Sequence, residues 1–346
     1  MQAGNRVSCA SIRFGAFDSV NIAVLGAGAW GTALAISFAA RHKVVLWTRD
    51  AAQCETMRRE RANAHYLPGH VFPQSLNVEA DFANATAHAD LLLIGTSTSG
   101  LGDTALASAS LGKPVLWVCK GFDKTTGLLP HETVSTALPV GLPYGALSGP
   151  SFAQEVAKGL PCALTLAAND AAFAKSTAEA LNSPALRIYH HDDLIGVELG
   201  GALKNVMAIA AGLSDGMGLG LNARAALITR GLAEIVRLGV AMGGRAETFM
   251  GLTGLGDLVL TATGDLSRNR TVGVELAKGK SLDEILSTLG HVAEGVNSAA
   301  TTLKRARVLG VDMPITEAVN AVLFDGAPPR EALARLLARE TKAESR

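Results

Sequence analysis

Hydrophobic positions divide the chain into two parts with different patterns. In the first part, short runs of β-branched residues and leucine alternate with helix-like stretches such as 33–40 and 171–181. The runs expected to form buried strands are 20–25, 43–47, 90–95, 114–119, 145–148, 163–167 and 186–189. Strands that alternate with helices form a mostly parallel sheet with helices on both faces. The first part is therefore predicted to be an α/β domain.

The second part begins after residue 191, where the strand-like runs stop. Its segments follow a helical pattern and are separated by glycines and by Pro328-Pro329, which end helices. The helices expected here are 193–214, 222–242, 267–278, 282–289, 296–309, 315–323 and 329–339. We predict a tail at 1–18, a sheet domain at 19–191 and an all-α domain at 192–346.

Composition and charge narrow the classes of function. Of the 346 residues, 48% are hydrophobic and 18% are charged, which is typical of a compact globular protein and not of a disordered chain. Lys+Arg and Asp+Glu both number 31, so there is no basic excess for a nucleic-acid backbone or an anionic membrane surface. We therefore expect no nucleic-acid partner.

The sequence also argues against a membrane span and a metal site. Residues 19–40 carry no formal charge, but glycines and polar residues interrupt them, so a strand, a turn and a helix fit better. Residues 1–18 show no apolar targeting region, which indicates a cytoplasmic protein. The cysteines, Cys9, Cys54, Cys119 and Cys162, lie far apart without metal-ligand spacing, so we predict neither a disulfide framework nor a metal site.

The strongest local motif is Gly26-Ala27-Gly28-Ala29-Trp30-Gly31, between the first predicted strand and a helix. In a dinucleotide fingerprint, Gly26 permits the tight turn, Gly28 lets backbone N–H groups approach a pyrophosphate, and Gly31 lets the helix pack on the strand. The partial positive charge of the helix N-terminus favours the phosphates. The sheet domain is therefore predicted to be of the Rossmann type and to bind NAD or NADP.

The end of the second predicted strand bears on the choice of cofactor. An acidic residue about 20 positions after the first glycine holds the ribose of NAD in this fold, and the chain has Arg49-Asp50 there. Arg49 could meet the 2′-phosphate of NADP, while Asp50 keeps NAD open. A surface Arg-Asp pair in a turn is the alternative, with nearly equal weight.

Lys204 is a candidate for proton transfer. It lies in an apolar helix-like stretch with no other formal charge between Glu198 and Asp215. Partial desolvation would favour the neutral amine and suit it to exchange a proton with a hydroxyl group. The alternative is a lysine whose stem packs while its ammonium reaches water. Asp257 either caps a helix, as the sequence alone favours, or holds a nearby lysine or a substrate hydroxyl.

Two further motifs point to anion binding and to a rival chemistry. Ser267-Arg268-Asn269-Arg270 opens a predicted helix, whose free N–H groups and two guanidinium groups predict an anion site that would suit a phosphomonoester. The alternative is a solvated helix start with scattered arginines, which is slightly less favoured. Gly149-Pro150-Ser151-Phe152-Ala153 resembles a loosened nucleophile elbow of a serine hydrolase. The motif lacks its final glycine, and Ser151 with Gln154 forms a capping box, so hydrolysis is the weaker hypothesis.

Together the motifs resemble one family, the bacterial NAD(P)-dependent glycerol-3-phosphate dehydrogenases. They occur in the family's order from residue 20 to the last helix, and as a set they are far more specific than any one alone. The matching elements are 26–31, 119–121, 148–153, 200–205, 254–258, 267–270 and Glu294-Gly295.

The resemblance implies a role for each matched position. Implied cofactor contacts, beside the glycines of the turn, are Ala29, Trp30, Arg49, Lys120, Ala153, Arg268, Val292 and Glu294. Implied substrate contacts are Lys120, Gly149, Ser151, Lys204, Asp257, Ser267, Arg268 and Asn269. Lys204 is implied to be the proton acceptor. The family also implies a homodimer that supplies glycerol 3-phosphate for phospholipid synthesis.

The sequence departs from the family at two places. After the run 91–94 the family usually has a Pro-Ser type turn, whereas this chain has Gly95-Thr96-Ser97-Thr98-Ser99, so the resemblance does not define the cofactor contacts of this loop. The segment before residue 19 is also longer than is typical.

We therefore predict an oxidoreductase that interconverts sn-glycerol 3-phosphate and dihydroxyacetone phosphate by hydride exchange with NAD or NADP. One alternative is a two-domain dehydrogenase that acts on an unphosphorylated hydroxy acid. Another is a dinucleotide sensor without catalytic activity. Activity with dihydroxyacetone phosphate, compared with dihydroxyacetone, distinguishes these hypotheses.

Overall fold

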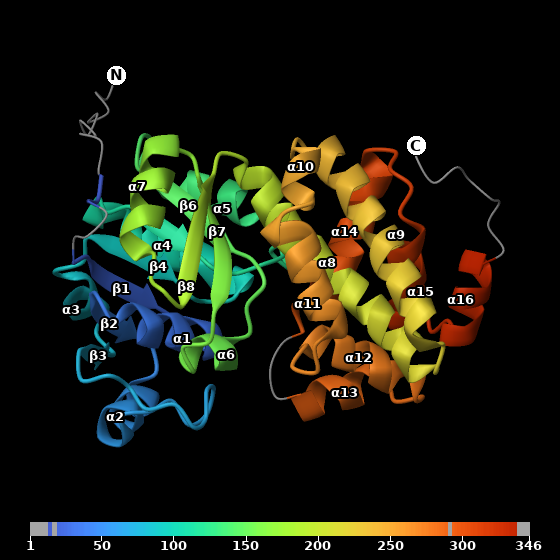
Figure 1. The fold of residues 1–346 in the computed structure, drawn as a ribbon, viewed down its shortest axis with the longest axis horizontal. Coiled ribbons are helices and arrows are strands. Elements are labelled where there is room, and N and C mark those ends of the chain that lie inside the picture. The colour runs from blue at the N-terminus through green and yellow to red at the C-terminus, as the bar shows by residue number, and fades with distance from the viewer. Residues whose placement is uncertain (1–12, 16–18, 290–292, 338–346) are drawn as a thin grey trace. The chain divides into compact units, whose positions relative to one another are not determined.

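The computed structural model describes residues 13–15, 19–289 and 293–337, and the chain in it forms two compact units. We call the unit that ends at Glu198 the sheet unit and the unit that begins at Leu199 the helical unit (Figure 1). Of the predicted tail, only residues 13–15 are described, and Phe14 packs against the core of the sheet unit. Val292, an implied cofactor contact, lies outside the described residues.

The sheet unit is built on an eight-stranded sheet in the order β3-β2-β1-β4-β5-β6-β7-β8. All neighbouring strands are parallel except β6 and β7. The strand order reverses between β1 and β4, and open α/β sheets bind ligands at such a switch point. The strands are β1 Asn21–Leu25, β2 Lys43–Trp47, β3 Leu76–Glu79, β4 Leu91–Ile94, β5 Val115–Trp117, β6 Tyr144–Ser148, β7 Cys162–Ala168 and β8 Leu186–His191.

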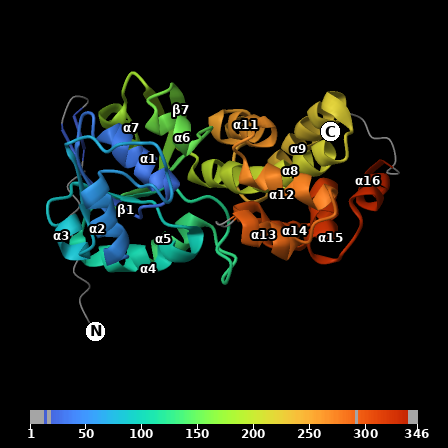
Figure 2. The ribbon, with the colours of Figure 1, turned by 90° about the horizontal axis from the view of Figure 1, so that it is seen from below.

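Helices cover both faces of this sheet, because the central strands are apolar on both sides. One core cluster joins the sheet to α1, α2 and α7, and another joins it to α4, α5 and the start of α8, Leu194–Gly216. Figure 2 shows α1 and α7 on one side of the sheet and α4 and α5 on the other. The helices are α1 Ala29–Phe38, α2 Ala51–Glu60, α3 Phe82–Thr86, α4 Thr98–Ser108, α5 Pro130–Ala137, α6 Ala153–Ala157 and α7 Ala171–Leu181.

The helical unit surrounds α8, Leu194–Gly216, of which every residue from Val197 to Ser214 is buried. This is the one described helix that is long and apolar enough to cross a membrane, but 89% of its apolar window is buried inside the structure. The remaining helices are α9 Gly220–Ala241, α10 Ala246–Phe249, a π-helical turn Leu252–Gly256, α11 Asp257–Thr263, α12 Arg268–Ala277, α13 Leu282–Leu289, α14 Glu294–Val308, α15 Pro314–Phe324 and α16 Pro329–Leu337.

The first turns of α8 belong to the sheet unit. The buried Glu198 carboxylate accepts hydrogen bonds from the Trp117 indole N–H at 3.0 Å and from the His131 backbone N–H at 2.9 Å. Burial raises the pKa of Glu198, although these donors and the His131 ring oppose the shift. The division between the units thus falls inside α8, seven residues beyond the predicted domain boundary at 191 and 192.

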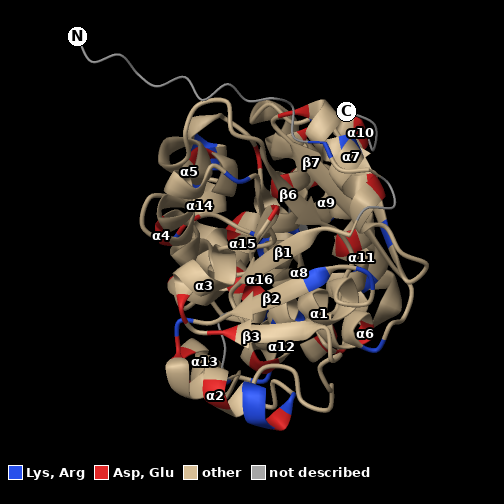
Figure 3. Ribbon diagram, turned by 90° about the vertical axis from the view of Figure 1, so that its left-hand side faces the viewer, with Lys and Arg blue, Asp and Glu red and all other residues tan. Residues whose placement is uncertain are grey.

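The predicted fold class is confirmed, while several short elements were not predicted. β3 is four residues long and buries only Leu76 and Val78, so its apolar run is too short to stand out. α10 and α11 have four and seven residues, which is less than two helical turns of periodic pattern. Figure 3 shows charged residues of both signs scattered over the ribbon.

Candidate active site

The glycine turn after β1 has the conformation that the motif requires. Gly26 has φ +128°, and a Cβ there would lie 2.8 Å from the Gly95 carbonyl carbon. A Cβ at Gly31 would lie 2.1 Å from the Gly26 carbonyl oxygen, so α1 packs directly on the turn. At Gly28, in contrast, a Cβ would meet nothing within 4 Å. Gly26 and Gly31 therefore allow close packing of the backbone, whereas Gly28 borders open space.

The N-terminus of α1 fits a dinucleotide pyrophosphate. Gly28 is its N-cap, no side chain caps the helix, and its first turn holds no acidic residue. The backbone N–H groups of such a turn attract phosphate, because their hydrogen bonds are not used within the helix. Trp30 and Ala153 pack on one small apolar cluster, formed by Ala33, Leu67 and Val156, beside this turn.

Two residues that bear on the choice between NAD and NADP, Arg49 and Asp50, follow β2. Arg49 is exposed directly beyond β2. Asp50 is the N-cap of α2, and one of its carboxylate oxygens accepts hydrogen bonds from the N–H groups of Ala52 and Gln53 at 2.9 and 3.0 Å. Asp50 thus has a structural partner, whereas Arg49 is exposed.

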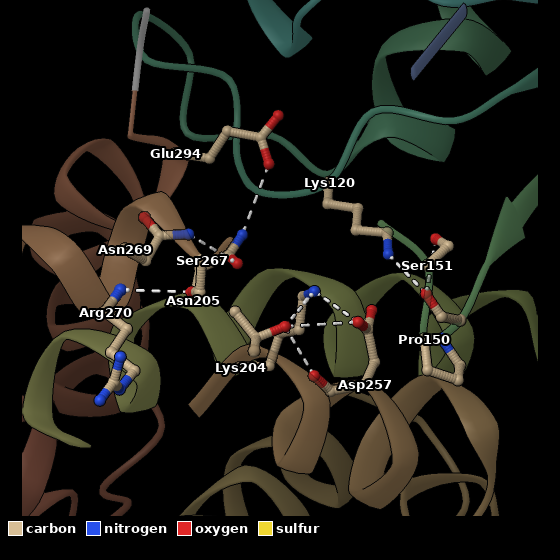
Figure 4. A network of polar contacts seen from close by, with 12 residues as sticks. Lys120, Pro150, Ser151, Lys204, Asn205, Asp257, Ser267, Asn269, Arg270 and Glu294 are labelled. Carbon is tan, nitrogen blue, oxygen red and sulfur yellow. Dashed lines mark hydrogen bonds and ion pairs between the residues drawn. The ribbon is translucent and has the colours of Figure 1, made fainter. Parts of the chain in front are cut away.

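Two loops at the carboxyl ends of β5 and β6 meet within the sheet unit. The Lys120 ammonium donates a hydrogen bond to the Gly149 carbonyl oxygen at 3.0 Å, and the Ser151 hydroxyl donates to the same oxygen at 3.1 Å. Gly149 has φ +142°, a conformation that favours glycine. The structure therefore brings together Lys120, Gly149 and Ser151, and Figure 4 shows Lys120 beside Ser151.

The predicted capping box at Ser151 is wrong. The N-cap of α6 is Phe152, without a side-chain cap, because the Ser151 hydroxyl is turned back to Gly149 instead of to the helix. A hydroxyl that donates to a backbone carbonyl has no general base at its proton, which is not the arrangement of an activated serine nucleophile. The serine hydrolase hypothesis thus loses its geometric support.

Lys204 forms the centre of the polar site in the helical unit. Its Nζ donates to Asp257 Oδ1 at 2.6 Å and to Thr261 Oγ1 at 2.8 Å (Figure 4). All three side chains are buried, with Lys204 7% and Asp257 1% exposed. Lys204 is therefore not the lone ammonium that the sequence suggests, since Asp257 balances its charge across two helices. The Asp257 side chain contacts the lysine, and the N-cap of α11 is Gly256.

Small residues allow α8 and the π-helical turn to come close enough for this ion pair. A Cβ at Gly200 on α8 would lie 2.5 Å from the Thr253 carbonyl oxygen of the turn. On its other side the turn packs on α10, where a Cβ at Gly254 would lie 2.0 Å from the Phe249 carbonyl oxygen. Gly200 precedes Lys204 by one helical turn and shares its face. The close approach at Gly200 therefore places the start of α11, and with it Asp257, against Lys204.

A second polar chain joins α8, α12 and α14. Asn269 Nδ2 donates to Asn205 Oδ1 at 2.9 Å, Asn205 Nδ2 donates to Glu294 Oε2 at 3.4 Å, and the Gly295 N–H donates to Asn269 Oδ1 at 3.0 Å. A Cβ at Gly295 would lie 2.7 Å from the Asn205 carbonyl oxygen, so only glycine fits there. The implied contacts Asn269 and Glu294 are thus linked through Asn205.

The start of α12 is capped as predicted. Ser267 is the N-cap and its hydroxyl accepts from the Arg270 N–H at 3.3 Å, while Arg268 is exposed in the first turn. Arg270 does not join Arg268 in an anion site, because its guanidinium pairs with Asp215 at 2.8 Å and Asp265 at 3.1 Å. The expected pair of guanidinium groups is therefore reduced to Arg268.

Sequence reasoning missed Thr261 as a member of this polar cluster, and it included Asn205 in the matched segment 200–205 without giving it a role. Thr261 follows Asp257 by one turn of the same helix, so i, i+4 spacing could have indicated it. Asn205 adjoins Lys204 in the chain. Within the described ranges, no group of three or more His, Cys, Asp or Glu gathers as a metal site would need. Of the cysteines that the structure describes, Cys54, Cys119 and Cys162 are not in disulfides.

The fold and the glycine turn define an NAD(P)-dependent dehydrogenase with a Rossmann sheet unit and a helical second unit. The sequence matches the NAD-dependent glycerol-3-phosphate dehydrogenase N-terminus over residues 21–174 and the C-terminus of the same enzyme over residues 193–334. The chain belongs to this family. The predicted family, the oxidoreductase class and the NAD(P) cofactor are thereby confirmed.

Relatives and solved structures agree with this assignment. The NAD(P)+ glycerol-3-phosphate dehydrogenase of Janthinobacterium sp. (strain Marseille) is 57% identical over 329 residues, which cover 94% of this chain and 99% of the relative. That of Thiobacillus denitrificans is 58% identical over 94% of this chain and 100% of the relative. The glycerol-3-phosphate dehydrogenase structure from Coxiella burnetii is 40% identical with a TM-score of 0.88, covering 93% of this chain and 99% of that one.

Proposed function

We propose that this chain catalyses the NAD(P)-dependent interconversion of sn-glycerol 3-phosphate and dihydroxyacetone phosphate, with Lys204 as its proton donor and acceptor. The observation that carries the proposal is the buried contact of Lys204 with Asp257 and Thr261, in a chain of the glycerol-3-phosphate dehydrogenase family. In this proposal residues 19–191 bind the dinucleotide, and residues 192–346 supply the proton-transfer group and the phosphate anchor.

Lys204 is suited to both directions of the reaction. The nicotinamide ring, when bound, supplies or accepts the hydride. During reduction the Lys204 ammonium gives a proton to the carbonyl oxygen as it becomes an alkoxide, so an N–H bond breaks and an O–H bond forms. During oxidation the neutral amine takes the hydroxyl proton. Asp257 and Thr261 hold the Nζ atom in place by hydrogen bonds at 2.6 and 2.8 Å.

The substrate phosphate is assigned to the start of α12. Ser267 caps this helix, and Arg268 provides an exposed guanidinium in its first turn. Backbone N–H groups and a guanidinium together bind phosphate with charge-assisted hydrogen bonds. Asn269 is buried beside them and is assigned to the glycerol part of the substrate, with Lys120, Gly149 and Ser151 as further contacts.

The cofactor is assigned to the turn at Gly26, Gly28 and Gly31 and to the N-terminus of α1. Ala29, Trp30, Ala153, Lys120, Arg268 and Glu294 are the further proposed contacts. Because Asp50 caps α2 while Arg49 is exposed, we expect NADPH to be used as well as NADH. An Arg49→Ala variant should raise the KM for NADPH and leave that for NADH within about twofold, since a surface charge acts on the extra phosphate.

The biological setting is also a proposal. We infer a cytoplasmic homodimer whose glycerol 3-phosphate enters phospholipid synthesis, and the support is the resemblance to the family. Light scattering on the purified protein tests the dimer, because a monomer would have the mass of the 35.7 kDa chain.

The activity is tested by following NADH or NADPH consumption after addition of dihydroxyacetone phosphate. We expect turnover with the phosphate ester and far less with dihydroxyacetone. Equal activity with both compounds would favour a dehydrogenase for unphosphorylated hydroxy compounds. Binding of NADH without turnover of any such substrate would favour the dinucleotide sensor.

A further inference from the structure

Asn63 lies outside every motif in the sequence, yet it contacts the glycine turn. It is 1% exposed and lies between α2 and β3. Its Nδ2 donates to the Ala27 carbonyl oxygen at 2.9 Å and to Thr32 Oγ1 at 2.8 Å. A single amide group therefore connects the residue before the N-cap of α1 with the first turn of that helix.

The segment around Asn63 is itself held in place. Asn63 Oδ1 accepts from the Tyr66 N–H at 3.2 Å, and the Asn63 carbonyl oxygen accepts from the Leu67 N–H at 2.9 Å. Leu67 is 1% exposed, and a bridge between Ala62 and Val71 closes the segment. The side chain of Asn63 thus has partners for both its amide atoms and a fixed backbone, as a residue that positions another group requires.

The contact with Ala27 determines how the next N–H is oriented. In a planar trans peptide the carbonyl and the following N–H point in opposite directions. With the Ala27 oxygen held by Asn63, and by Gln53 Nε2 at 3.4 Å, the Gly28 N–H points away from Asn63. A rotated peptide would instead present a carbonyl oxygen to a phosphate, which repels negative charge.

We propose that Asn63 is a positioning residue for the dinucleotide: it fixes the Ala27–Gly28 peptide so that the Gly28 N–H faces the pyrophosphate. The inference rests on the dinucleotide-binding part of the proposed function and not on the identity of the substrate. Asn63 acts through the backbone and contributes no atom to the reaction. Its loss should therefore weaken nucleotide binding without changing the proton transfer at Lys204.

The test is binding of NADH to Asn63→Asp, measured by calorimetry on the full chain. This change keeps the acceptor for Tyr66 and removes both donated hydrogen bonds. Asn182→Asp is the matched control, because Asn182 Nδ2 also donates to two oxygens, at 2.7 and 2.9 Å, and its Oδ1 accepts one N–H at 2.8 Å. We expect NADH to bind roughly 10-fold more weakly to Asn63→Asp, as for a lost hydrogen bond to a charged group, and within about twofold of wild type to Asn182→Asp.

Steady-state kinetics separate positioning from general loss of structure. At saturating NADH, Asn63→Asp should keep kcat and the KM for dihydroxyacetone phosphate within about threefold of wild type. When the NADH concentration is varied instead, the KM for NADH should rise by the same factor as the Kd for NADH. If NADH affinity stays at the wild-type value although the melting temperature falls as far as in Asn182→Asp, Asn63 has a structural role alone.

A second variant and a measurement on wild type complete the test. Should Asn63→Asp not fold, Asn63→Ser removes the same two hydrogen bonds and is measured in the same way, with the same expected loss of NADH affinity; unchanged affinity in it overturns the proposal. Wild type that binds NADH but does not turn over dihydroxyacetone phosphate contradicts the proposed substrate. The difference in NADH affinity between wild type and variant still decides the role of Asn63.

Discussion

The two candidate binding regions are built in different ways. In the sheet unit, the turn at Gly26 to Gly31 presents backbone N–H groups from residues that are neighbours in the chain, and distant residues such as Gly95 and Asn63 only pack against it. In the helical unit, the buried pair Lys204 and Asp257 joins side chains that are 53 positions apart. A backbone site depends on close packing of glycines, whereas a side-chain site depends on how helices meet. Substitutions should therefore fail in different ways in the two regions.

The largest effect is expected at Lys204. Lys204→Ala removes the group that exchanges the proton, so kcat should fall by roughly 10² to 10⁴-fold, as for the loss of a general acid or base. NADH affinity should stay within about twofold, because Lys204 is not among the proposed cofactor contacts. Thr261→Val is the control, since it keeps the ion pair and removes one hydrogen bond. A kcat for Lys204→Ala within about threefold of wild type would mean that another group carries the proton.

A smaller effect is expected at Arg268. Arg268→Ala should raise the KM for dihydroxyacetone phosphate by roughly 10- to 100-fold, because a charge-assisted hydrogen bond to phosphate is lost. Arg330→Ala is a matched control, as Arg330 is also exposed in the first turn of a helix. Steady-state kinetics at saturating NADH measure both variants. Equal KM values for wild type and Arg268→Ala would remove α12 from the phosphate site.

The glycine turn offers a comparison within a few residues. Gly31→Ala places a Cβ 2.1 Å from a backbone oxygen and should lower the free energy of unfolding by about 1–3 kcal/mol. The Cβ of Gly28→Ala meets no protein atom within 4 Å, so this variant should unfold like wild type. Because Gly28 lets the backbone N–H groups approach the pyrophosphate, the same variant should bind NADH about 10-fold more weakly. Urea unfolding and calorimetry measure the two quantities. A destabilised Gly28→Ala with normal NADH affinity would reverse the roles assigned to the two glycines.

The same contrast explains what could be predicted from the sequence. The strand predicted at 43–47 has the bounds of β2, and the glycine turn was placed correctly, because both patterns are local. For Asp257 the sequence alone favours a helix cap over its alternative, contact with a nearby lysine, since the close approach at Gly200 that brings Asp257 to Lys204 is a property of helix packing. Asn63 left no signal, because a single asparagine between two elements has no periodicity or motif.

The helical unit contains a further buried carboxyl group, whose effect on stability is expected to be the smallest. Glu234, on α9, is 1% exposed and accepts hydrogen bonds from the N–H groups of Ile315 at 2.6 Å and Thr316 at 3.2 Å, at the start of α15. Burial raises the pKa of Glu234 to about 7, although these hydrogen bonds oppose the shift. The folded state therefore holds this proton more tightly than the unfolded chain does.

A raised pKa in the folded state stabilises the protein at low pH, and this contribution is lost as the pH rises through about 7. From pH 6 to pH 8 it should lower the free energy of unfolding of wild type by about 1 kcal/mol. Glu234→Gln keeps one of the two acceptor oxygens and cannot ionise, so it should lack this part of the pH dependence in urea unfolding. If wild type and Glu234→Gln lose equal stability over this range, Glu234 does not titrate there, and the pH dependence of the helical unit comes from other groups.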